Sequence, residues 1–138
     1  MPEPGLAQRT RSGPGRLLIA VYAVFALAAT ARSAVQIGTR FGEAPVAYLL
    51  SAFAAVVYVV ATVCLVRGSA TSRTVAWVSI VVELVGVLAV GTFSLVDPQA
   101  FPDATVWSEF GRGYVFIPAV LPVLGLWWLR VSARDPVA

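Results

Sequence analysis

Four long apolar stretches follow one another along the chain, separated by short groups of glycine and polar residues. They cover residues 16–37, 45–66, 74–96 and 113–130. About 20 consecutive apolar residues make a helix long enough to cross the hydrocarbon core of a bilayer. A helix also satisfies its own backbone hydrogen bonds, which lipid cannot do. The pattern therefore predicts an all-α membrane protein, folded as a bundle of four transmembrane helices.

Little of the chain is left outside these stretches. They form one predicted transmembrane domain over residues 16–131, flanked by two short tails, residues 1–15 and 132–138. The first tail is rich in proline, glycine and arginine and is expected to be flexible. With 59% hydrophobic and 12% charged residues, the chain has too little polar surface for a water-soluble globule, so no soluble domain is expected.

The arginines predict how the bundle is oriented, because positive residues near the ends of spans are retained on the cytoplasmic side. Seven lie at the two tails or in the connection between the second and third stretches, against three on the other side. The seven are Arg9, Arg11, Arg16, Arg67, Arg73, Arg130 and Arg134, and the three are Arg32, Arg40 and Arg112. We therefore expect a multi-pass protein of the plasma (inner) membrane with both termini in the cytoplasm.

The first stretch also has features of a cleaved secretory signal. Basic residues precede an apolar run over 17–28, and the small residues at 29–31 resemble a cleavage site. The apolar stretch nevertheless continues past Arg32 to Ile37 before the first turn residue. We expect the segment to be retained as a span, with cleavage as the alternative.

Histidine is absent and Cys64 is the single cysteine. This composition excludes a disulfide within the chain, histidine-ligated metals or haem, and histidine-based acid–base catalysis. The arginines are scattered singly, which argues against nucleic acid as a partner. We expect no cofactor, no metal and no enzymatic activity, because a nucleophile–base pair and a phosphate-binding loop are absent as well.

Three tryptophans are predicted to anchor the bundle at the membrane interfaces. Trp127 and Trp128 end the fourth stretch beside Arg130, which is the usual order of an aromatic belt and an anchoring charge. Trp107 belongs to the irregular connection over 97–112, where aromatic and charged residues alternate. A short amphipathic turn lying in the interface explains this mixture. A partner-binding or gating loop is the alternative.

Glu83 is the most unusual charge, since it lies about nine residues or roughly 13 Å into the third stretch, close to mid-membrane. An ionised carboxylate there is costly, so it should be protonated, paired or facing water. Tyr58 and Pro122 lie at the same predicted depth. Pro122 should kink the fourth helix, and Pro118 either kinks or starts it. Glu83 could therefore donate to the freed carbonyl of Pro118 or share a proton with the Tyr58 hydroxyl.

Three interpretations of Glu83 stay open at this point. A structural hydrogen bond could lock the third helix against its neighbours. A proton or cation site could use Glu83 together with Tyr58, since membrane carboxylates often exchange protons for cargo. A bond to a larger membrane partner is the third possibility.

Arg32 lies about sixteen residues into the first stretch, near the boundary opposite the termini. A long side chain at this depth can reach the headgroups. Such snorkelling is the default expectation. The alternative is an ion pair, for which Glu83 lies about seven residues or some 10 Å away in depth, so Asp97, Glu109 or Glu43 in the outer leaflet is better placed.

Three segments resemble those of small, uncharacterised four-span membrane proteins of actinobacteria: RSAVQIGTRFGEAPVAYLLSA, WVSIVVELVGVLAVGTFSLVDP and GYVFIPAVLPVLGLWWLR. The resemblance covers nearly the whole chain after the first tail. It implies the four-span topology and brings no activity with it. Four spans and a buried carboxylate are also similar to small multidrug resistance transporters, but their essential carboxylate is in the first helix, whereas Glu83 is in the third.

The sequence favours a non-enzymatic structural or accessory subunit of a membrane assembly. Its partners would be the lipid bilayer and either a larger membrane protein or a second copy through self-association. The alternative is a small oligomeric proton-coupled transporter or channel in which Glu83 is the exchanging group.

Overall fold

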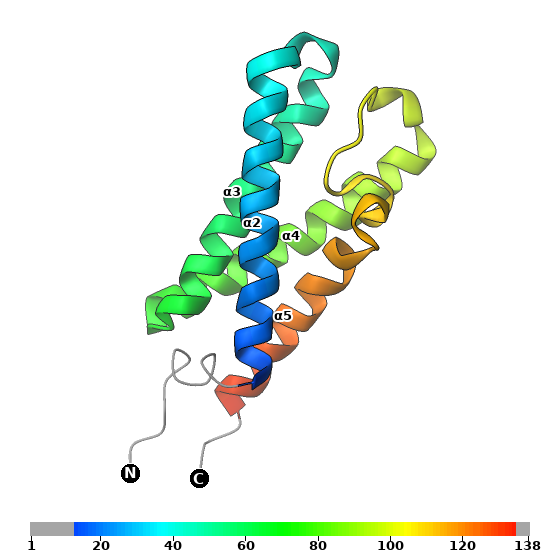
Figure 1. The fold of residues 1–138 in the computed structure, drawn as a ribbon. Coiled ribbons are helices and arrows are strands. Elements are labelled where there is room, and N and C mark those ends of the chain that lie inside the picture. Colours follow the sequence, from blue (N-terminus) through cyan, green and yellow to red (C-terminus); the bar gives the residue numbers. More distant parts are fainter. Residues whose placement is uncertain (1–12, 135–138) are drawn as a thin grey trace, which may run out of the picture.

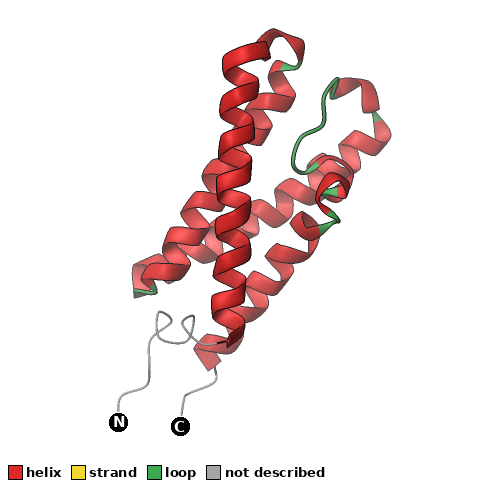
Figure 2. Cartoon of the chain, in the orientation of Figure 1, coloured by secondary structure: helices red, strands yellow, loops and turns green. Residues whose placement is uncertain are grey.

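The computed structural model describes residues 13–134, with side chains up to Ser132. Over this range the chain is helix and loop without a strand (Figure 2). The four long helices are α2 (Gly13–Arg40), α3 (Pro45–Arg67), α4 (Ala70–Val96) and α5 (Ile117–Arg134) (Figure 1). The expected flexible tail lies outside the described residues up to position 12, and so do residues 135–138 of the second tail.

The first three helices include the predicted stretches and extend beyond them. α2 continues through Gly38, which the sequence analysis placed in a turn. α3 ends at Arg67, because the next residue, Gly68, has a left-handed φ of 65° and its N–H reaches the carbonyl of Cys64 at 3.0 Å. α4 begins four residues earlier than predicted because Ser69 caps it, its hydroxyl accepting from the N–H of Ser72 at 3.1 Å.

The fourth helix begins later than the predicted residue 113. Residues Arg112–Tyr114 form a separate 3-10 turn, and Val115 and Phe116 have φ values of 57° and 61°, which interrupt the helix. Pro118 lies in the first turn of α5, where its missing N–H costs little, so it starts the helix. Pro122 lies inside α5, and a kink there stays a prediction.

Three helices are long and apolar enough to cross a membrane, namely those within Gly13–Glu43, Pro45–Arg67 and Ala70–Val96. A fourth crossing requires Ser108–Tyr114 and Ile117–Ser132 to be taken together, although they meet at an angle of 99°. The prediction of an all-helical chain with membrane-length apolar helices is thus confirmed.

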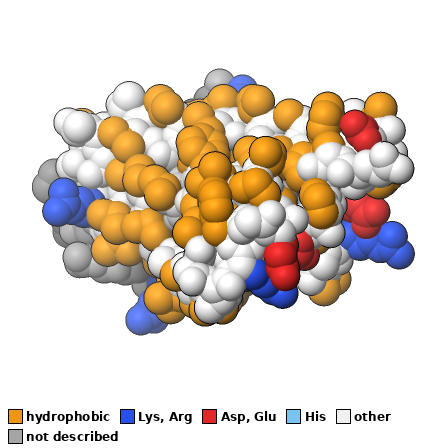
Figure 3. Space-filling model, turned by 90° about the horizontal axis from the view of Figure 1, so that it is seen from above, with side chains coloured by type: hydrophobic (Ala, Val, Ile, Leu, Met, Phe, Trp, Pro, Cys, Tyr) orange, Lys and Arg blue, Asp and Glu red, His pale blue; other side chains and the backbone are white. Residues whose placement is uncertain are grey.

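The outside of the helices matches a lipid environment. Large apolar side chains lie exposed along them, among them Leu27 at 74% and Val96 at 77% exposed. Figure 3 shows apolar side chains spread over one face, with charged side chains gathered in a few places. Water-soluble proteins rarely expose apolar surface on this scale.

The helices pack in chain order, α2 on α3, α3 on α4 and α4 on α5, whereas α2 touches α5 over only a short stretch. We call the end that carries the α2–α3 turn and residues 97–116 the loop end (Figure 1). At the opposite end Arg73 of α4 donates to the carbonyl of Leu129 and, at 3.5 Å, to the hydroxyl of Ser132. This arginine joins the start of α4 to the last turns of α5.

Residues 97–116, which we call the connecting segment, fold back against α4 (Figure 1). Three short 3-10 turns punctuate the segment, at Pro98–Ala100, Ser108–Phe110 and Arg112–Tyr114. Its position between the helices, instead of flat at their ends, is the main departure from the predicted architecture.

Candidate functional site

Glu83 lies thirteen residues from each end of α4 and has no solvent-exposed surface. The hydroxyl of Tyr22 in α2 donates to its Oε2 at 3.0 Å. Its other oxygen, Oε1, has no hydrogen-bond partner among the described residues. The structure thus places a carboxyl group at the midpoint of a membrane-length helix and ties it to a neighbouring helix through one oxygen.

Tyr22 is the partner that the sequence analysis missed. Its hydroxyl also faces α5, because a Cβ added to Gly125 would lie 2.9 Å from that oxygen and 3.0 Å from Cδ1 of Ile80. The carboxyl–phenol pair therefore sits where α2, α4 and α5 come together. Gly125, in the middle of a helix, was the available signal, since a helical glycine costs about 1 kcal/mol relative to alanine and calls for a packing reason.

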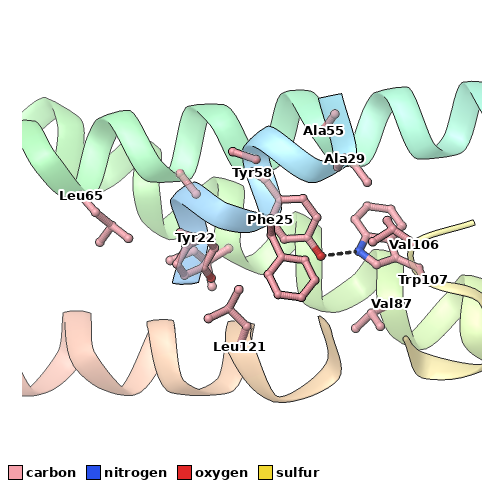
Figure 4. Close-up of a cluster of buried hydrophobic side chains, with 14 of the residues drawn as sticks. Tyr22, Phe25, Ala29, Ala55, Tyr58, Leu65, Val87, Val106, Trp107 and Leu121 are labelled. Atoms are coloured by element: carbon pink, nitrogen blue, oxygen red, sulfur yellow. Dashed lines mark hydrogen bonds between the residues drawn. The ribbon is translucent and has the colours of Figure 1, made fainter. Parts of the chain in front are cut away.

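Tyr58 does not bond to Glu83, contrary to the expectation that the two share a proton. Its hydroxyl accepts a hydrogen bond of 3.1 Å from Nε1 of Trp107 (Figure 4). Its ring centroid lies 6.3 Å from that of Tyr22 and 5.8 Å from that of Phe25. Tyr58 is therefore a neighbour of the carboxyl–phenol pair, whereas the predicted bond from Glu83 to the carbonyl of Pro118 is replaced by the bond from Tyr22.

Trp107 is buried, and its prediction as an interfacial anchor is wrong. Only 1% of its surface is exposed, and the six-membered part of the indole ring packs against α4, where a Cβ on Gly86 would come within 2.5 Å of it. Phe53 of α3 meets the ring edge-on at 6.2 Å between centroids. The indole is buried because Gly86 makes space for its ring and Tyr58 gives its N–H a partner, which a buried indole needs.

Other residues of the connecting segment also contact α4. The ring of Phe110 covers Gly91, where an added Cβ would lie 2.4 Å from it. Ser94 of α4 accepts from the N–H of Glu109 at 2.7 Å and donates to the carbonyl of Gly91 at 2.8 Å. Glu109 and Phe110 have φ values of 51° and 62°, which cost side-chain-bearing residues about 1–2 kcal/mol each. The contacts with α4 hold this strained backbone in place.

Arg32 does not pair with Asp97. It donates through one nitrogen to the hydroxyl of Tyr114 at 2.7 Å and through another to the carbonyl of Ala104 at 3.4 Å, and its guanidinium lies 5.9 Å from the centre of the Tyr114 ring. The folding-back of the connecting segment brings Tyr114 beneath Arg32. Asp97, the residue after α4, lies exposed at the start of the segment.

The two tryptophans near the end of α5 differ from each other. Trp127 is 54% exposed, whereas Trp128 is half-buried with an Nε1 that has no partner in the described part of the chain. Their role as interfacial anchors stays a prediction. Cys64 is a half-buried free thiol. Between positions 13 and 134 no three Cys, Asp or Glu side chains cluster closely enough to hold a metal ion.

Fold and site together define a class: an all-helical protein with membrane-length apolar helices, a buried carboxyl–phenol pair at its centre and a connecting segment inserted between its helices. No protein family, curated protein or solved structure matches the chain in comparison. The resemblance to four-span actinobacterial proteins therefore stays a prediction.

Proposed function

We propose that this chain is a four-span protein of the plasma membrane with both termini in the cytoplasm, serving as a non-enzymatic structural or accessory subunit of a membrane assembly. The observation that carries the proposal is the burial and the interhelical hydrogen bond of Glu83. Its carboxyl group accepts from Tyr22 on another helix and is fully buried. A polar group placed in this way joins helices together.

The energetics of helix association in lipid support this role. Lipid tails give no hydrophobic driving force for bringing helices together. Packing and interhelical hydrogen bonds, worth about 0.6–2 kcal/mol per bond, therefore drive helix association. The Tyr22–Glu83 bond connects α2 with α4, and the Trp107–Tyr58 bond connects the connecting segment with α3. Both contribute to one fixed arrangement of the helices.

An aromatic layer separates this pair from the loop end. The Tyr114 and Phe25 ring centroids lie 5.5 Å apart, and those of Phe25 and Tyr58 lie 5.8 Å apart. Phe25, which lies between the two tyrosines, has no group that can carry a proton, and a proton path needs water or an unbroken chain of titratable groups. This layer favours a structural Glu83 over an exchanging one.

A small oligomeric proton-coupled transporter or channel is the second candidate. One observation favours it, namely the unpartnered Oε1 of the buried Glu83. A buried acceptor without a partner is costly, and such groups often mark functional positions. Proton binding at this oxygen is what a coupled transporter would use.

Purified protein reconstituted into liposomes separates the two candidates. Glu83→Gln keeps an acceptor for Tyr22 and removes titration, and Tyr22→Phe leaves the carboxyl group without its donor. The structural proposal expects proton uptake equal to that of empty liposomes, little loss of stability in E83Q, and about 1–3 kcal/mol lost in Y22F. Proton flux above the empty-liposome level that disappears in E83Q would overturn it.

The subunit role and the topology are tested in cells. Affinity purification from native membranes in mild detergent should recover a larger membrane protein in fixed stoichiometry. Recovery of the chain alone, repeatedly and from cross-linked membranes, speaks against a subunit. Reporter fusions at the two ends should report the cytoplasm, and an external signal at either end refutes the proposed orientation.

A further inference from the structure

A cavity of about 540 Å³ lies at the loop end, between α2, the last turns of α4 and the connecting segment. Its volume falls within the roughly 300–1,000 Å³ typical of small-molecule sites. Polar side chains that line it include Arg32, Arg112, Glu109 and Tyr114. Two guanidinium groups against one carboxylate leave this lining with a net positive charge.

The charge on Arg32 is not neutralised by a carboxylate. Its two acceptors, the Tyr114 hydroxyl and the carbonyl of Ala104, are both neutral. No Asp or Glu within the described range lies within 4 Å of it. A guanidinium has five N–H donors, so a half-buried Arg32 keeps donors to spare.

The other charged lining groups compensate each other. Arg112 lies 3.4 Å from Glu109, and both are substantially exposed, at 72% and 42% of their side chains. Tyr114 accepts from Arg32, and its own O–H remains as a donor toward the cavity. The donors that no carboxylate occupies are therefore those of the Arg32 guanidinium and the Tyr114 phenol, with the more exposed Arg112 at the rim.

The depth of Arg32 corresponds to a membrane headgroup region. It lies sixteen residues after Arg16, where the predicted span begins, which is about 24 Å along a helix, so its long side chain reaches the headgroups at the far side of a hydrocarbon core of about 30 Å. A guanidinium at that level is well suited to phosphate, to which it can donate two parallel hydrogen bonds.

We propose that the loop-end cavity binds a phosphate group, held by Arg32 and Tyr114 with Arg112 at the rim. Phosphate can come from an anionic lipid headgroup or from a small phosphorylated molecule. Both offer the same oxygens to the same donors, and the depth of Arg32 favours the lipid.

Thermal unfolding of the purified protein in a neutral detergent, followed by tryptophan fluorescence, tests this site. The probes are phosphatidylglycerol, diacylglycerol with the same acyl chains, and inorganic phosphate. At saturation phosphatidylglycerol should raise the unfolding midpoint by about 5 °C or more. Arg32→Gln and Arg112→Gln should remove most of that shift. Arg40→Gln is the matched control, because it removes the same charge at the loop end without lining the cavity, and it should keep the shift.

The Arg32 variant also loses two hydrogen bonds to the connecting segment. The variants are therefore compared by the shift that the ligand produces in the unfolding midpoint, not by the midpoint itself. Tyr114→Phe serves as a second variant that keeps the ring and should also reduce the shift. A response to phosphatidylglycerol alone identifies a lipid headgroup, and an equal response to inorganic phosphate identifies a free phosphate compound. The proposal is overturned if diacylglycerol gives the same shift, if neither phosphate source gives one, or if R32Q and Y114F respond like the parent protein.

Discussion

Replacing Gly86 by alanine tests whether Trp107 is really inserted between the helices. An added Cβ would lie 2.5, 2.6 and 2.9 Å from three carbon atoms of the indole ring. Since ordinary van der Waals contact begins at 3.4 Å, the nearest atom of the indole ring would have to move about 0.9 Å away from the new Cβ. The indole N–H donates to Tyr58 at 3.1 Å, so withdrawal of the ring breaks or bends that bond.

The expected cost follows from three contributions. Overpacking of a filled interior costs about 1–3 kcal/mol. Loss of the indole–phenol hydrogen bond costs about 0.6–1.5 kcal/mol. Alanine recovers up to about 1 kcal/mol relative to glycine through its helix propensity. With the full propensity gain subtracted, we therefore expect Gly86→Ala to destabilise the protein by about 0.6–3.5 kcal/mol.

Unfolding with sodium dodecyl sulfate in mixed micelles, followed by tryptophan fluorescence, measures this cost. Gly38→Ala is the control, because the added Cβ at this helical position meets nothing within 4 Å. It should be neutral or slightly stabilising. Combining G86A with Trp107→Leu should abolish the cost of G86A. An undiminished cost without the indole, or a G86A protein as stable as G38A, would refute the placement of Trp107.

Three further substitutions use the same unfolding assay. Val115→Gly should stabilise the protein by about 0.5–1 kcal/mol, because Val115 is 81% exposed and holds a strained φ of 57°; a loss of stability contradicts the strain. Ser94→Ala removes the acceptor of the Glu109 N–H and should cost about 1–3 kcal/mol, so an unchanged midpoint counts against that bond. Gly125→Ala pushes on the Tyr22 hydroxyl and should cost about 1–3 kcal/mol, less so when Tyr22 is already phenylalanine.

The membrane-length helices could be predicted because hydropathy is a local property. An apolar stretch can be recognised from about 20 residues of sequence, whatever it packs against. Even the errors at the ends were local in origin. Ser69 is of a residue type that caps helices, and Gly38 does not end α2 because an isolated glycine inside a helical pattern is tolerated.

The connecting segment could not be placed in the same way. Trp107 stands among polar residues next to a membrane-length stretch, a context that ordinarily means an interfacial anchor. Its burial depends on a space over α4 that exists only because Gly86 has no side chain. Gly86 and Gly91 were a usable signal, because two glycines inside a helix are costly unless something packs on them.

The partner of Glu83 could not be predicted either, for a geometrical reason. The sequence gives the depth of a residue along its helix but not the direction in which its side chain points around the axis. Tyr58 and Pro122 were chosen on depth alone. Tyr22 is the actual partner because α2, α4 and α5 converge on it, which depends on helix rotation and crossing.

The connecting segment links the loop-end cavity to the centre of the bundle. Tyr114 lines the cavity and packs on Phe25, and Phe25 packs on Tyr58, which holds Trp107. The cavity and the core therefore share one row of contacting side chains. A phosphate bound at Arg32 would thus stabilise the connecting segment, which also covers the core. The strained backbone at Glu109 and Val115 is tolerated because contacts with α4 and with Arg32 hold the segment in place.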